Sequence, residues 1–252
     1  MKSASWKLTW GDEFTGSGPL NSKIWSTLTT TRTAKFPCSD TLPQNAYRQG
    51  GAAVLKVSRL AGDAGKVTKK CPTGQVGNAM VQADNPAQRM QYGFAAARVK
   101  WAPLGGMHSA FWLDSPSDAP AMTAAAPRVE IDIAEYFGDG RSKGGLATFV
   151  HSMTPKGIKS VGGEFQSRQL LPKKKEWSQG WHVYSVEWSP TGYIFRVDGV
   201  ITLKTAKNVS HSPKRLLLSS LTSSWEIPKL KIGKLPTVTK FDWVHVWENP
   251  KA

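Results

Sequence analysis

Residues 129–138 read Val-Glu-Ile-Asp-Ile-Ala-Glu-Tyr-Phe-Gly, and three carboxylates are spaced unevenly through this apolar segment. Glu130 and Asp132 are two residues apart, whereas Glu135 follows three residues later. In an α-helix, with about 100° of rotation per residue, the three side chains would diverge around the axis. In a regular strand Glu130 and Asp132 would share one face, and Glu135 would lie on the other. Neither regular structure gathers the three acids.

One inserted residue would bring the acids together. A β-bulge between Asp132 and Glu135 would return Glu135 to the face of the other two carboxylates. Ile131 and Ile133 would then point into the core from the opposite face. The segment therefore predicts a bulged strand on which three carboxylates converge.

Converging carboxylates point to acid–base chemistry. They repel one another, and apolar neighbours raise carboxyl pKa values further, which keeps an acid protonated near neutral pH. Two carboxyl groups about 5–5.5 Å apart across a glycosidic bond form the catalytic pair of a retaining glycosidase. A third acid between them can hold the nucleophile and separate the two pKa values. The alternatives are an exposed face of solvated acids and part of a calcium site. The pattern alone is compatible with all three.

The rest of the chain predicts an all-β protein. Short runs rich in β-branched and aromatic residues alternate with Gly- and Pro-containing turns, and little 3.6-residue periodicity is sustained. We expect long loops at 61–73 and 116–127. No linker or internal repeat is evident, which predicts a single domain over residues 1–252. The expected strands lie at 52–59, 94–101, 109–113, 128–136, 145–151, 182–188, 193–200, 216–221 and 240–247.

The charge is strongly unbalanced. Lys and Arg number 33 against 18 Asp and Glu, a formal net charge of +15. The basic clusters are scattered, and no nucleic-acid-binding signature accompanies them, so we expect solvated surface charge with weak attraction to anionic cell-wall polymers. The chain lacks an apolar run of about 18 residues and a signal-peptide core at its beginning. We therefore expect neither nucleic-acid binding nor membrane insertion, and no intact signal peptide.

The cysteines and tryptophans leave alternatives open. Cys38 and Cys71 are the only cysteines, and in a secreted protein they would form one disulfide, whereas in the cytosol they would remain thiols. Two cysteines and five dispersed histidines make no metal-ligand pattern. Eleven tryptophans fit either a large aromatic core or a groove in which sugar rings stack.

The acid-rich segment resembles the catalytic segment of glycoside hydrolase family 16 in its bulged form, Glu-x-Asp-x-x-Glu. This resemblance implies a β-jelly-roll sandwich, concanavalin A-like, of two antiparallel sheets with a concave substrate cleft. It also implies catalysis without a cofactor. Other segments that resemble the family in order along the chain are 6–16 with 23–25, 45–57, 91–115, 145–151, 181–199 and 240–250.

The resemblance also implies residue roles. Glu130 is implied as the nucleophile, Asp132 as the assisting acid and Glu135 as the acid/base. His151, which ends the segment Thr-Phe-Val-His, is implied near Asp132 or the sugar, although a histidine at a strand end is commonly structural. The further candidates for substrate binding, each with a structural alternative, are Trp112, Trp225 and Asn45.

Two features concern the surroundings of the site. Many family members bind a structural calcium on the convex side, and Glu13 and Asp242 stand at ligand positions there, with salt-bridged or solvated acids as the alternative. Met107-His108 replaces a Trp-Pro pair that family members acting on neutral glucans often carry. We expect this replacement to affect substrate choice without touching the three acids.

We therefore expect a secreted, monomeric endo-glycoside hydrolase that retains anomeric configuration. The bulged motif resembles the laminarinase-like branch, which favours β-1,3- or β-1,3(1,4)-glucan as the substrate. An anionic or neutral galactan of the agar, carrageenan or porphyran type is an alternative, as is transglycosylation. Outside the enzymes, the alternatives are a carbohydrate-binding lectin on the same fold and a cell-wall-binding module. A lectin would be expected to lose at least one of the acids.

Overall fold

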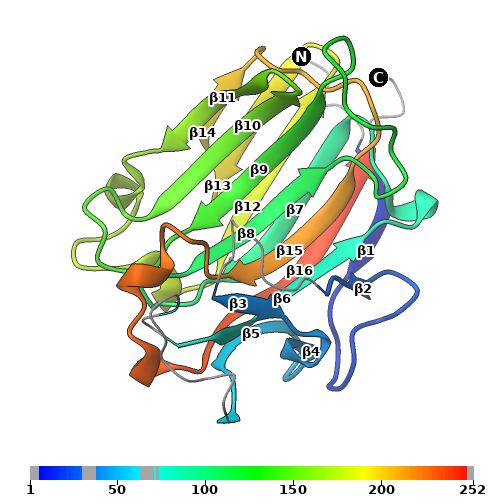
Figure 1. The fold of residues 1–252 in the computed structure, drawn as a ribbon. Helices are drawn as coiled ribbons and strands as arrows, with labels where there is room; N and C mark the ends of the chain where they lie inside the picture. Colours follow the sequence, from blue (N-terminus) through cyan, green and yellow to red (C-terminus); the bar gives the residue numbers. More distant parts are fainter. Residues whose placement is uncertain (1–5, 30–37, 63–70, 72–73, 249–252) are drawn as a thin grey trace.

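The structure is a computed structural model that describes residues 6–29, 38–62, 71 and 74–248. The described chain is built from β-strands that follow one hydrogen-bonded path and stack as two layers (Figure 1). Helical segments within these residues are short 3-10 turns, and none is long enough to cross a membrane. These turns are η1 (Pro43–Asn45), η3 (Pro86–Gln88), η4 (Ser167–Leu170), η5 (Trp177–Gln179), η6 (Ile227–Lys229) and η7 (Ile232–Lys234). The all-β prediction is confirmed.

The first layer, which we call the β9 sheet, carries the acid-rich segment near its centre (Figure 1). Neighbouring strands of its main path are antiparallel, so residues on adjacent strands can be matched one against one. In spatial order its strands are β11 (Gly157–Glu164), β10 (Leu146–Thr154), β9 (Arg128–Tyr136), β8 (His108–Asp114), β15 (Arg215–Leu221) and β6 (Val76–Ala83), and β2 (Ser26–Thr27) also pairs with β6.

The second layer, the β7 sheet, continues the path from β6 through β5. Its strands are also antiparallel, and the one parallel pairing described in the protein joins β3 to β6. In spatial order the strands are β5 (Ala53–Arg59), β16 (Thr237–Glu248), β7 (Gly93–Lys100), β12 (His182–Ser189), β13 (Gly192–Val197) and β14 (Val200–Thr205). The flanking strands of this layer are β1 (Lys7–Asp12) and β4 (Ala46–Arg48), whereas β3 (Ser39–Thr41) pairs with β6.

The hydrophobic core lies between the two layers, directly behind the acid-rich strand. Ile131 and Ile133 of β9 are 0% and 2% exposed, as the bulged-strand prediction requires. The Trp101 ring lies 6.0 Å from the ring of Tyr136 in β9 and 5.1 Å from that of Tyr184 in β12. Buried aromatic pairs of this kind add about 0.5–1.5 kcal/mol each beyond their burial. The layer that carries the acids therefore packs against a rigid support.

Most expected strands are confirmed with boundaries shifted by a few residues, and the loop at 116–127 is confirmed as a connection without a strand. Residues 63–70 and 72–73 of the other expected loop lie outside the described residues. The sequence predicts no strand at β6 or β11, nor at β1 and the short strands β2, β3 and β4. β6 contains Gly77 and Asn78, poor strand formers, but is buried between β15 and β5. β11 is an edge strand with three glycines and an exposed face, so it lacks the apolar alternation of a half-buried strand.

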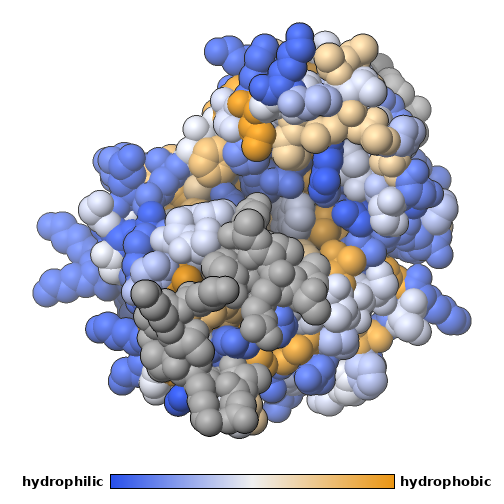
Figure 2. All heavy atoms as spheres, viewed as in Figure 1, coloured by the Kyte–Doolittle hydropathy of each residue, from blue (hydrophilic) through white to orange (hydrophobic). Residues whose placement is uncertain are grey.

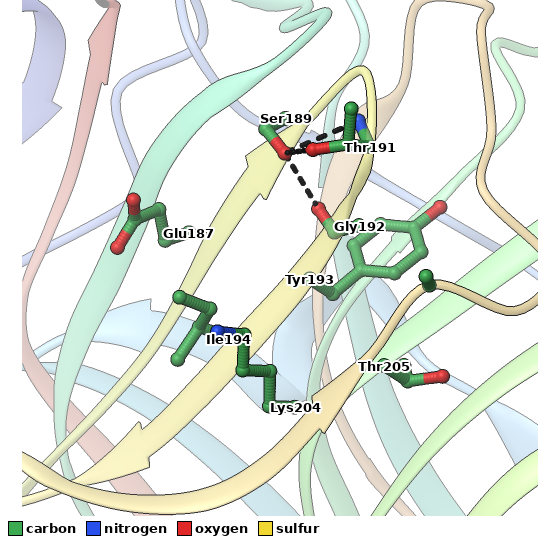
Figure 3. A pocket seen from close by; sticks show the side chains of 9 residues that line it. Glu187, Ser189, Thr191, Gly192, Tyr193, Ile194, Lys204 and Thr205 are labelled. Carbon is green, nitrogen blue, oxygen red and sulfur yellow. Dashed lines mark hydrogen bonds between the residues drawn. The ribbon is translucent and has the colours of Figure 1, made fainter.

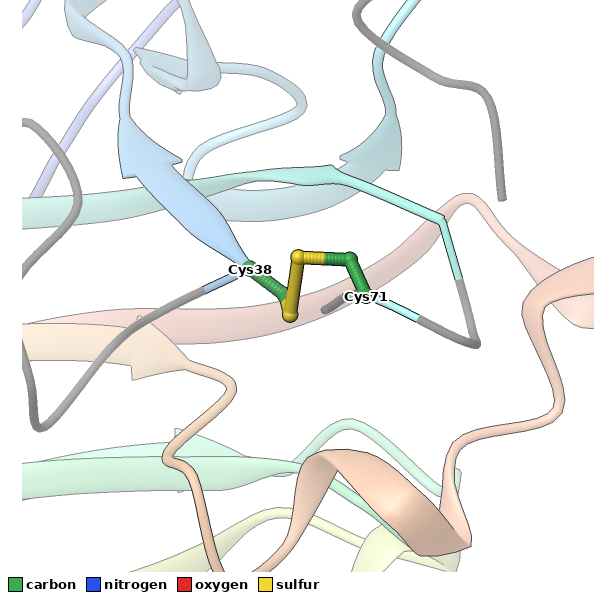
Figure 4. Close-up of a disulfide and its surroundings, with 2 residues drawn as sticks. All are labelled: Cys38 and Cys71. Atoms are coloured by element: carbon green, nitrogen blue, oxygen red, sulfur yellow. A yellow bond between two sulfur atoms is a disulfide. The ribbon is translucent and has the colours of Figure 1, made fainter. Parts of the chain in front are cut away.

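Cys38 and Cys71 form a disulfide, which resolves the open choice between a bridge and two thiols (Figure 4). Their Cα atoms are 5.4 Å apart, and both residues are 3% exposed. The bridge belongs to a small apolar cluster that also contains Met107, Ile227 and Leu230. Met107 directly precedes His108, the first residue of β8, so the disulfide cluster anchors the segment that leads into this strand.

We predict that the disulfide contributes substantially to stability. The bridge closes a sequence separation of 33 residues, and loop-closure entropy for such a loop is worth about 3–4 kcal/mol. The double variant Cys38→Ser/Cys71→Ser should lower the free energy of unfolding by about that amount in guanidinium titrations. Reduction of the wild type should have a similar effect, and reduction of the double variant should have none. An unchanged unfolding midpoint in the double variant would contradict this prediction.

Candidate active site

Strand β9 contains the predicted bulge. Asp132 lies opposite Trp112 of β8, and Ala134 lies opposite Phe111, the next residue back along that antiparallel strand. Ile133 is therefore an extra residue with no partner position of its own. The pairing with β10 shifts at the same place. Both neighbouring strands thus place the irregularity between the second and third acids, and the prediction is confirmed.

The bulge puts the three acids on one face of the β9 sheet. Glu135 lies opposite Ala110 of β8 and Asp132 lies opposite Trp112. Ala110 and Trp112 are two residues apart on a regular strand, so they share a face, and the acids paired with them share it too. Glu130 is half-buried, whereas Asp132 and Glu135 are 4% and 8% exposed. The carboxylates therefore line a surface with limited access to water.

His151 joins the first two acids into a compact group. It lies opposite Glu130 in the pairing of β9 with β10, and its Nε2 is 3.3 Å from Asp132 Oδ2. Its Nδ1 is 2.6 Å from Ser160 Oγ on β11, and its ring stacks on Phe149 with a 4.9 Å centroid separation. The prediction that His151 lies near Asp132 is confirmed. These contacts fix the imidazole between two strands.

The same three residues are the one group in the described part of the chain that could hold a metal ion. One ligand atom from each of Glu130, Asp132 and His151 lies within 4.8 Å of the others. Calcium prefers six to eight oxygen ligands, so two carboxylates and an imidazole are a poor set for it.

The expected calcium ligands have other partners. Glu13 Oε1 lies 2.6 Å from His245 Nε2, and Asp242 Oδ2 accepts a hydrogen bond of 2.6 Å from Arg98. Neither acid belongs to a group of three or more ligands within the described residues. Both acids are thus engaged with a side-chain partner in this structure, and a calcium site at Glu13 and Asp242 stays a prediction.

Glu135 is held by a different histidine. Its Oε1 is hydrogen-bonded to Nε2 of His108, the first residue of β8. His108 is 7% exposed as a whole residue, and its ring stacks on Phe137 at 5.1 Å, with Trp225 5.6 Å away. The expectation that Met107-His108 does not touch the acids is therefore wrong. Once Ala110 is placed opposite Glu135, His108 falls on the same face two residues away, a signal that needs the strand register.

The tryptophans predicted to bind substrate lie beside the acids, and the asparagine does not. Trp112 is half-buried on the face of the acids, and its Nε1 donates to Ser219 Oγ at 3.2 Å. Trp225 is 48% exposed next to His108. Asn45 is 2% exposed, and its amide nitrogen donates to the Gly77 carbonyl at 2.9 Å. This geometry argues against a sugar contact for Asn45, and we assign it a structural role.

Arg141 ties together the loops around Glu135 and was not found from the sequence. It donates to Glu164 of β11 at 3.1 Å and to the buried Glu226 at 3.3 Å, and Lys229 also pairs with Glu226. Its guanidinium carbon lies 5.2 Å from the Phe137 ring centre. Hydrogen bonding to Glu164 raises the pKa of Arg141, which keeps the network charged. A lone arginine in a loop carries no sequence signal for such a role.

An arginine-lined cavity of about 950 Å³ opens beside the end of β9 that carries Glu130. Arg128 lies two residues before Glu130 on the same face and donates from Nε to the fully buried Asp114 at 2.7 Å. Arg215 donates to Gln82 at 2.6 Å. Figure 2 views the molecule from the same side as Figure 1 and shows hydrophilic and apolar side chains mixed over that face. The cavity is lined by Pro86, Arg89, Gln91, residues 115–122, Ala126, Pro127, Arg128, Ser212, Pro213 and Arg215.

The cations around this cavity are only partly neutralised. Arg89 pairs with Asp84 at 3.1 Å and with Asp118 at 3.0 Å, and the Asp118 side chain is 68% exposed and therefore weakly held. Arg215 lies 3.7 Å from Asp84 and 3.5 Å from Asp114. Beneath the cavity, burial lowers the pKa of Lys214 to about 8, and its ammonium donates to Ser115 and Ser212. The Lys214 ammonium therefore remains mostly charged at neutral pH. Arg89, Arg128, Arg215 and Lys214 thus stand against Asp84, Asp114 and Asp118, which leaves one positive charge in excess among these described residues.

A second cavity, of about 310 Å³, lies on the β7 sheet, at the hairpin between β12 and β13 (Figure 3). Ser189 Oγ accepts from the Thr191 amide at 3.3 Å and donates to the Gly192 carbonyl at 3.2 Å, which closes the turn. The acid in its lining, Glu187, pairs with Arg196 at 2.9 Å. These contacts are those of a hairpin, and the cavity has no second carboxylate to work with Glu187.

Solved structures share this architecture. The catalytic domain of an endo-1,3-β-glucanase (laminarinase) from Thermotoga petrophila has a TM-score of 0.73 and 18% identity, covering 98% of this chain and 99% of that chain. Laminarinase from Flavobacterium sp. has a TM-score of 0.72 and 17% identity, and the match covers 96% of this chain and 100% of that chain. Porphyranase B from Zobellia galactanivorans has a TM-score of 0.73 and 22% identity, and the match covers 96% of this chain and 92% of that chain. At these identities the similarity establishes the fold, a jelly-roll sandwich.

Sequence comparison supplies the family. No curated protein matches the chain significantly. Residues 40–234, however, match the model of the glycosyl hydrolases family 16. This span includes all three acids of β9 and, apart from β2, every strand of the β9 sheet. The chain belongs to glycosyl hydrolases family 16.

Proposed function

We propose that the chain cleaves internal β-linkages of a polysaccharide with retention of anomeric configuration. The observation that carries this proposal is the bulge in β9, which gathers Glu130, Asp132 and Glu135 on one face. The outer two carboxylates also have separate partners, because Asp132 and His151 stand beside Glu130 whereas His108 holds Glu135. Two glutamates in unlike surroundings suit the unlike roles of nucleophile and acid/base. As a family 16 hydrolase, the chain needs no cofactor.

The reaction proceeds in two displacements. In the first, a carboxylate oxygen of Glu130 forms a bond to the anomeric carbon while the bond to the leaving sugar breaks. The electron pair of that bond goes to the glycosidic oxygen, which takes the proton of Glu135. In the second, the Glu135 carboxylate removes a proton from water, and the water oxygen displaces Glu130 from the anomeric carbon. Both glutamates return to their starting states.

The surroundings of Glu130 favour this role. Asp132 is buried between the two glutamates along β9, and His151 contacts it at 3.3 Å, so the pair can orient the Glu130 carboxylate. The Arg128 guanidinium lies near enough to interact electrostatically with Glu130, which favours the ionised form that a nucleophile requires. Trp112 and Trp225 supply flat surfaces on which sugar rings can stack.

We propose β-1,3-glucan or mixed β-1,3(1,4)-glucan as the substrate. Support comes from the bulged motif and from structural neighbours described as endo-1,3-β-glucanase and non-specific endo-β-1,3(4)-glucanase. We also propose that the protein is secreted, because a buried disulfide joins Cys38 and Cys71, and such bridges persist in oxidising compartments.

A second substrate class is an anionic galactan. The observation that favours it is the arginine-lined cavity, in which Arg128 stands two residues from Glu130 and a sulfate or carboxylate group could be bound. A porphyranase among the structural neighbours is consistent with this alternative. The arginines are already paired with Asp114 and Asp118, so the neutral glucan remains our first proposal.

We predict that Glu130→Gln abolishes cleavage and leaves the fold and glycan binding intact. Loss of the nucleophile should lower kcat by more than about 10³-fold, measured as reducing ends released from laminarin, with an unchanged melting temperature. Glu187→Gln on the β7 sheet is the matched control, because it makes the same change far from the acids, and should keep wild-type activity. Undiminished turnover by Glu130→Gln would refute the proposed mechanism.

We predict that laminarin is the best substrate in a panel that also contains lichenan, agarose, carrageenan, porphyran and arabinogalactan. A neutral glucan carries no charge for the cavity to bind, and the 43% exposed Arg128 side chain supports Glu130 only through solvent-screened electrostatics, so Arg128→Gln should lower kcat/KM on laminarin by less than about threefold. Arg98→Gln on the β7 sheet is the control. Faster cleavage of carrageenan or porphyran, reduced about tenfold by Arg128→Gln but not by Arg98→Gln, would replace the glucan with an anionic galactan.

A further inference from the structure

His108 is the one residue outside the acid triplet that is shown hydrogen-bonded to Glu135 among the described residues. It stands at the start of β8, where it lies opposite Leu221 of β15. The residue before it, Met107, is fully buried in the apolar cluster of the Cys38–Cys71 disulfide. The backbone of His108 is therefore held from both sides.

The His108 ring has little freedom to rotate. It stacks on Phe137 with an interplanar angle of 25° and meets Trp225 at 53°. The side chain is 9% exposed, and that of Glu135 is 11% exposed. A ring enclosed in this way presents Nε2 to Glu135 in one fixed direction. The hydrogen bond between them is thus imposed by packing on both sides of the imidazole.

The surroundings of the other ring nitrogen, Nδ1, indicate which of the two nitrogens of His108 carries the proton. Nδ1 of His108 is buried and has no hydrogen-bond partner among the described residues. A proton on Nδ1, in the other neutral tautomer or in the imidazolium, would be a buried donor without an acceptor among the described residues. The neutral ring with its proton on Nε2 is the favoured form.

We propose that His108 is a positioning residue for the acid/base of the reaction. In this form Nε2–H donates to Oε1 of Glu135, so Oε1 is occupied as an acceptor and Oε2 is left to carry the transferable proton. The inference rests on the proposed role of Glu135 as acid/base. His108 itself neither gains nor loses a proton in either displacement.

The arrangement serves both steps. In the first displacement, Oε2–H gives its proton to the glycosidic oxygen while Oε1 stays bound to His108. In the second, Oε2 accepts a proton from water, and the hydrogen bond from Nε2–H stabilises the carboxylate that must act as base. Without His108 the carboxyl could rotate about its terminal torsion, which is broad for glutamate. Proton transfer would then compete with unproductive orientations.

The test compares His108→Gln and His108→Leu on two substrates. One is laminarin, or the polysaccharide of the panel that the wild type cleaves. The other is a 2,4-dinitrophenyl β-glycoside of the same sugar, whose leaving group departs without protonation. His108→Leu should lower kcat/KM on the polysaccharide by roughly 10–100-fold, part of the 10²–10⁴-fold typical of general acid catalysis, mainly through kcat. On the aryl glycoside it should change kcat/KM by less than about threefold.

Replacement by glutamine should restore most of the rate, because its Nε2–H can reach the position of the imidazole Nε2. His108→Asn is the matched comparison, since its shorter amide corresponds to the position of Nδ1. If thermal unfolding shows that His108→Leu does not fold, the test rests on the two amide variants: kcat/KM on the polysaccharide should be higher for His108→Gln than for His108→Asn. Wild-type rates in His108→Leu, equal losses on both substrates, or Asn matching Gln would each overturn the proposal.

Glu135→Gln separates this proposal from the proposed function. An active Glu135→Gln variant would remove the acid/base role itself, and the role of His108 with it. An inactive Glu135→Gln variant together with His108 variants that behave like the wild type would overturn only the positioning role.

Discussion

The bulge at Ile133 is the constraint on which the active site depends. In a regular strand, Glu135 would face the core that encloses Ile131 and Tyr136, where an ionisable group without a partner is costly. The extra residue turns Glu135 outward while the apolar residues on either side remain buried. The neighbouring strands β8 and β10 both accommodate the shift. A single inserted residue therefore decides whether the strand presents two aligned carboxylates or three.

The two ends of the acid triplet are held by different parts of the fold. Glu130 belongs to a polar group in which His151 is fixed by a hydrogen bond to β11, and charged residues extend from it toward the cavity. Glu135 is held by His108 inside a cage of aromatic rings. The segment before β8 is anchored by the disulfide cluster around Cys38. This difference in surroundings suits the two chemically identical side chains to the different roles that we propose for them.

Sequence reasoning reached the parts of the structure that depend on local pattern. The uneven acid spacing predicted the bulge and the burial of Ile131 and Ile133, because strand alternation is a local property. It missed β6, whose poor strand formers are overridden by pairing on both sides, and the contact of His108 with Glu135, which requires the register between strands. It also misplaced Asn45, since a turn-forming residue can be buried beneath a loop as readily as exposed on it.

The most direct measurement of the central claim is the site of the covalent intermediate. A 2-deoxy-2-fluoro glucoside or laminaribioside with a 2,4-dinitrophenyl leaving group should accumulate a glycosyl ester, because the fluorine slows its hydrolysis. Mass spectrometry of the digested protein should place one glycosyl group on Glu130, and the Glu130→Gln variant should carry none. A label on Glu135, or products of inverted anomeric configuration with no label at all, would contradict the account.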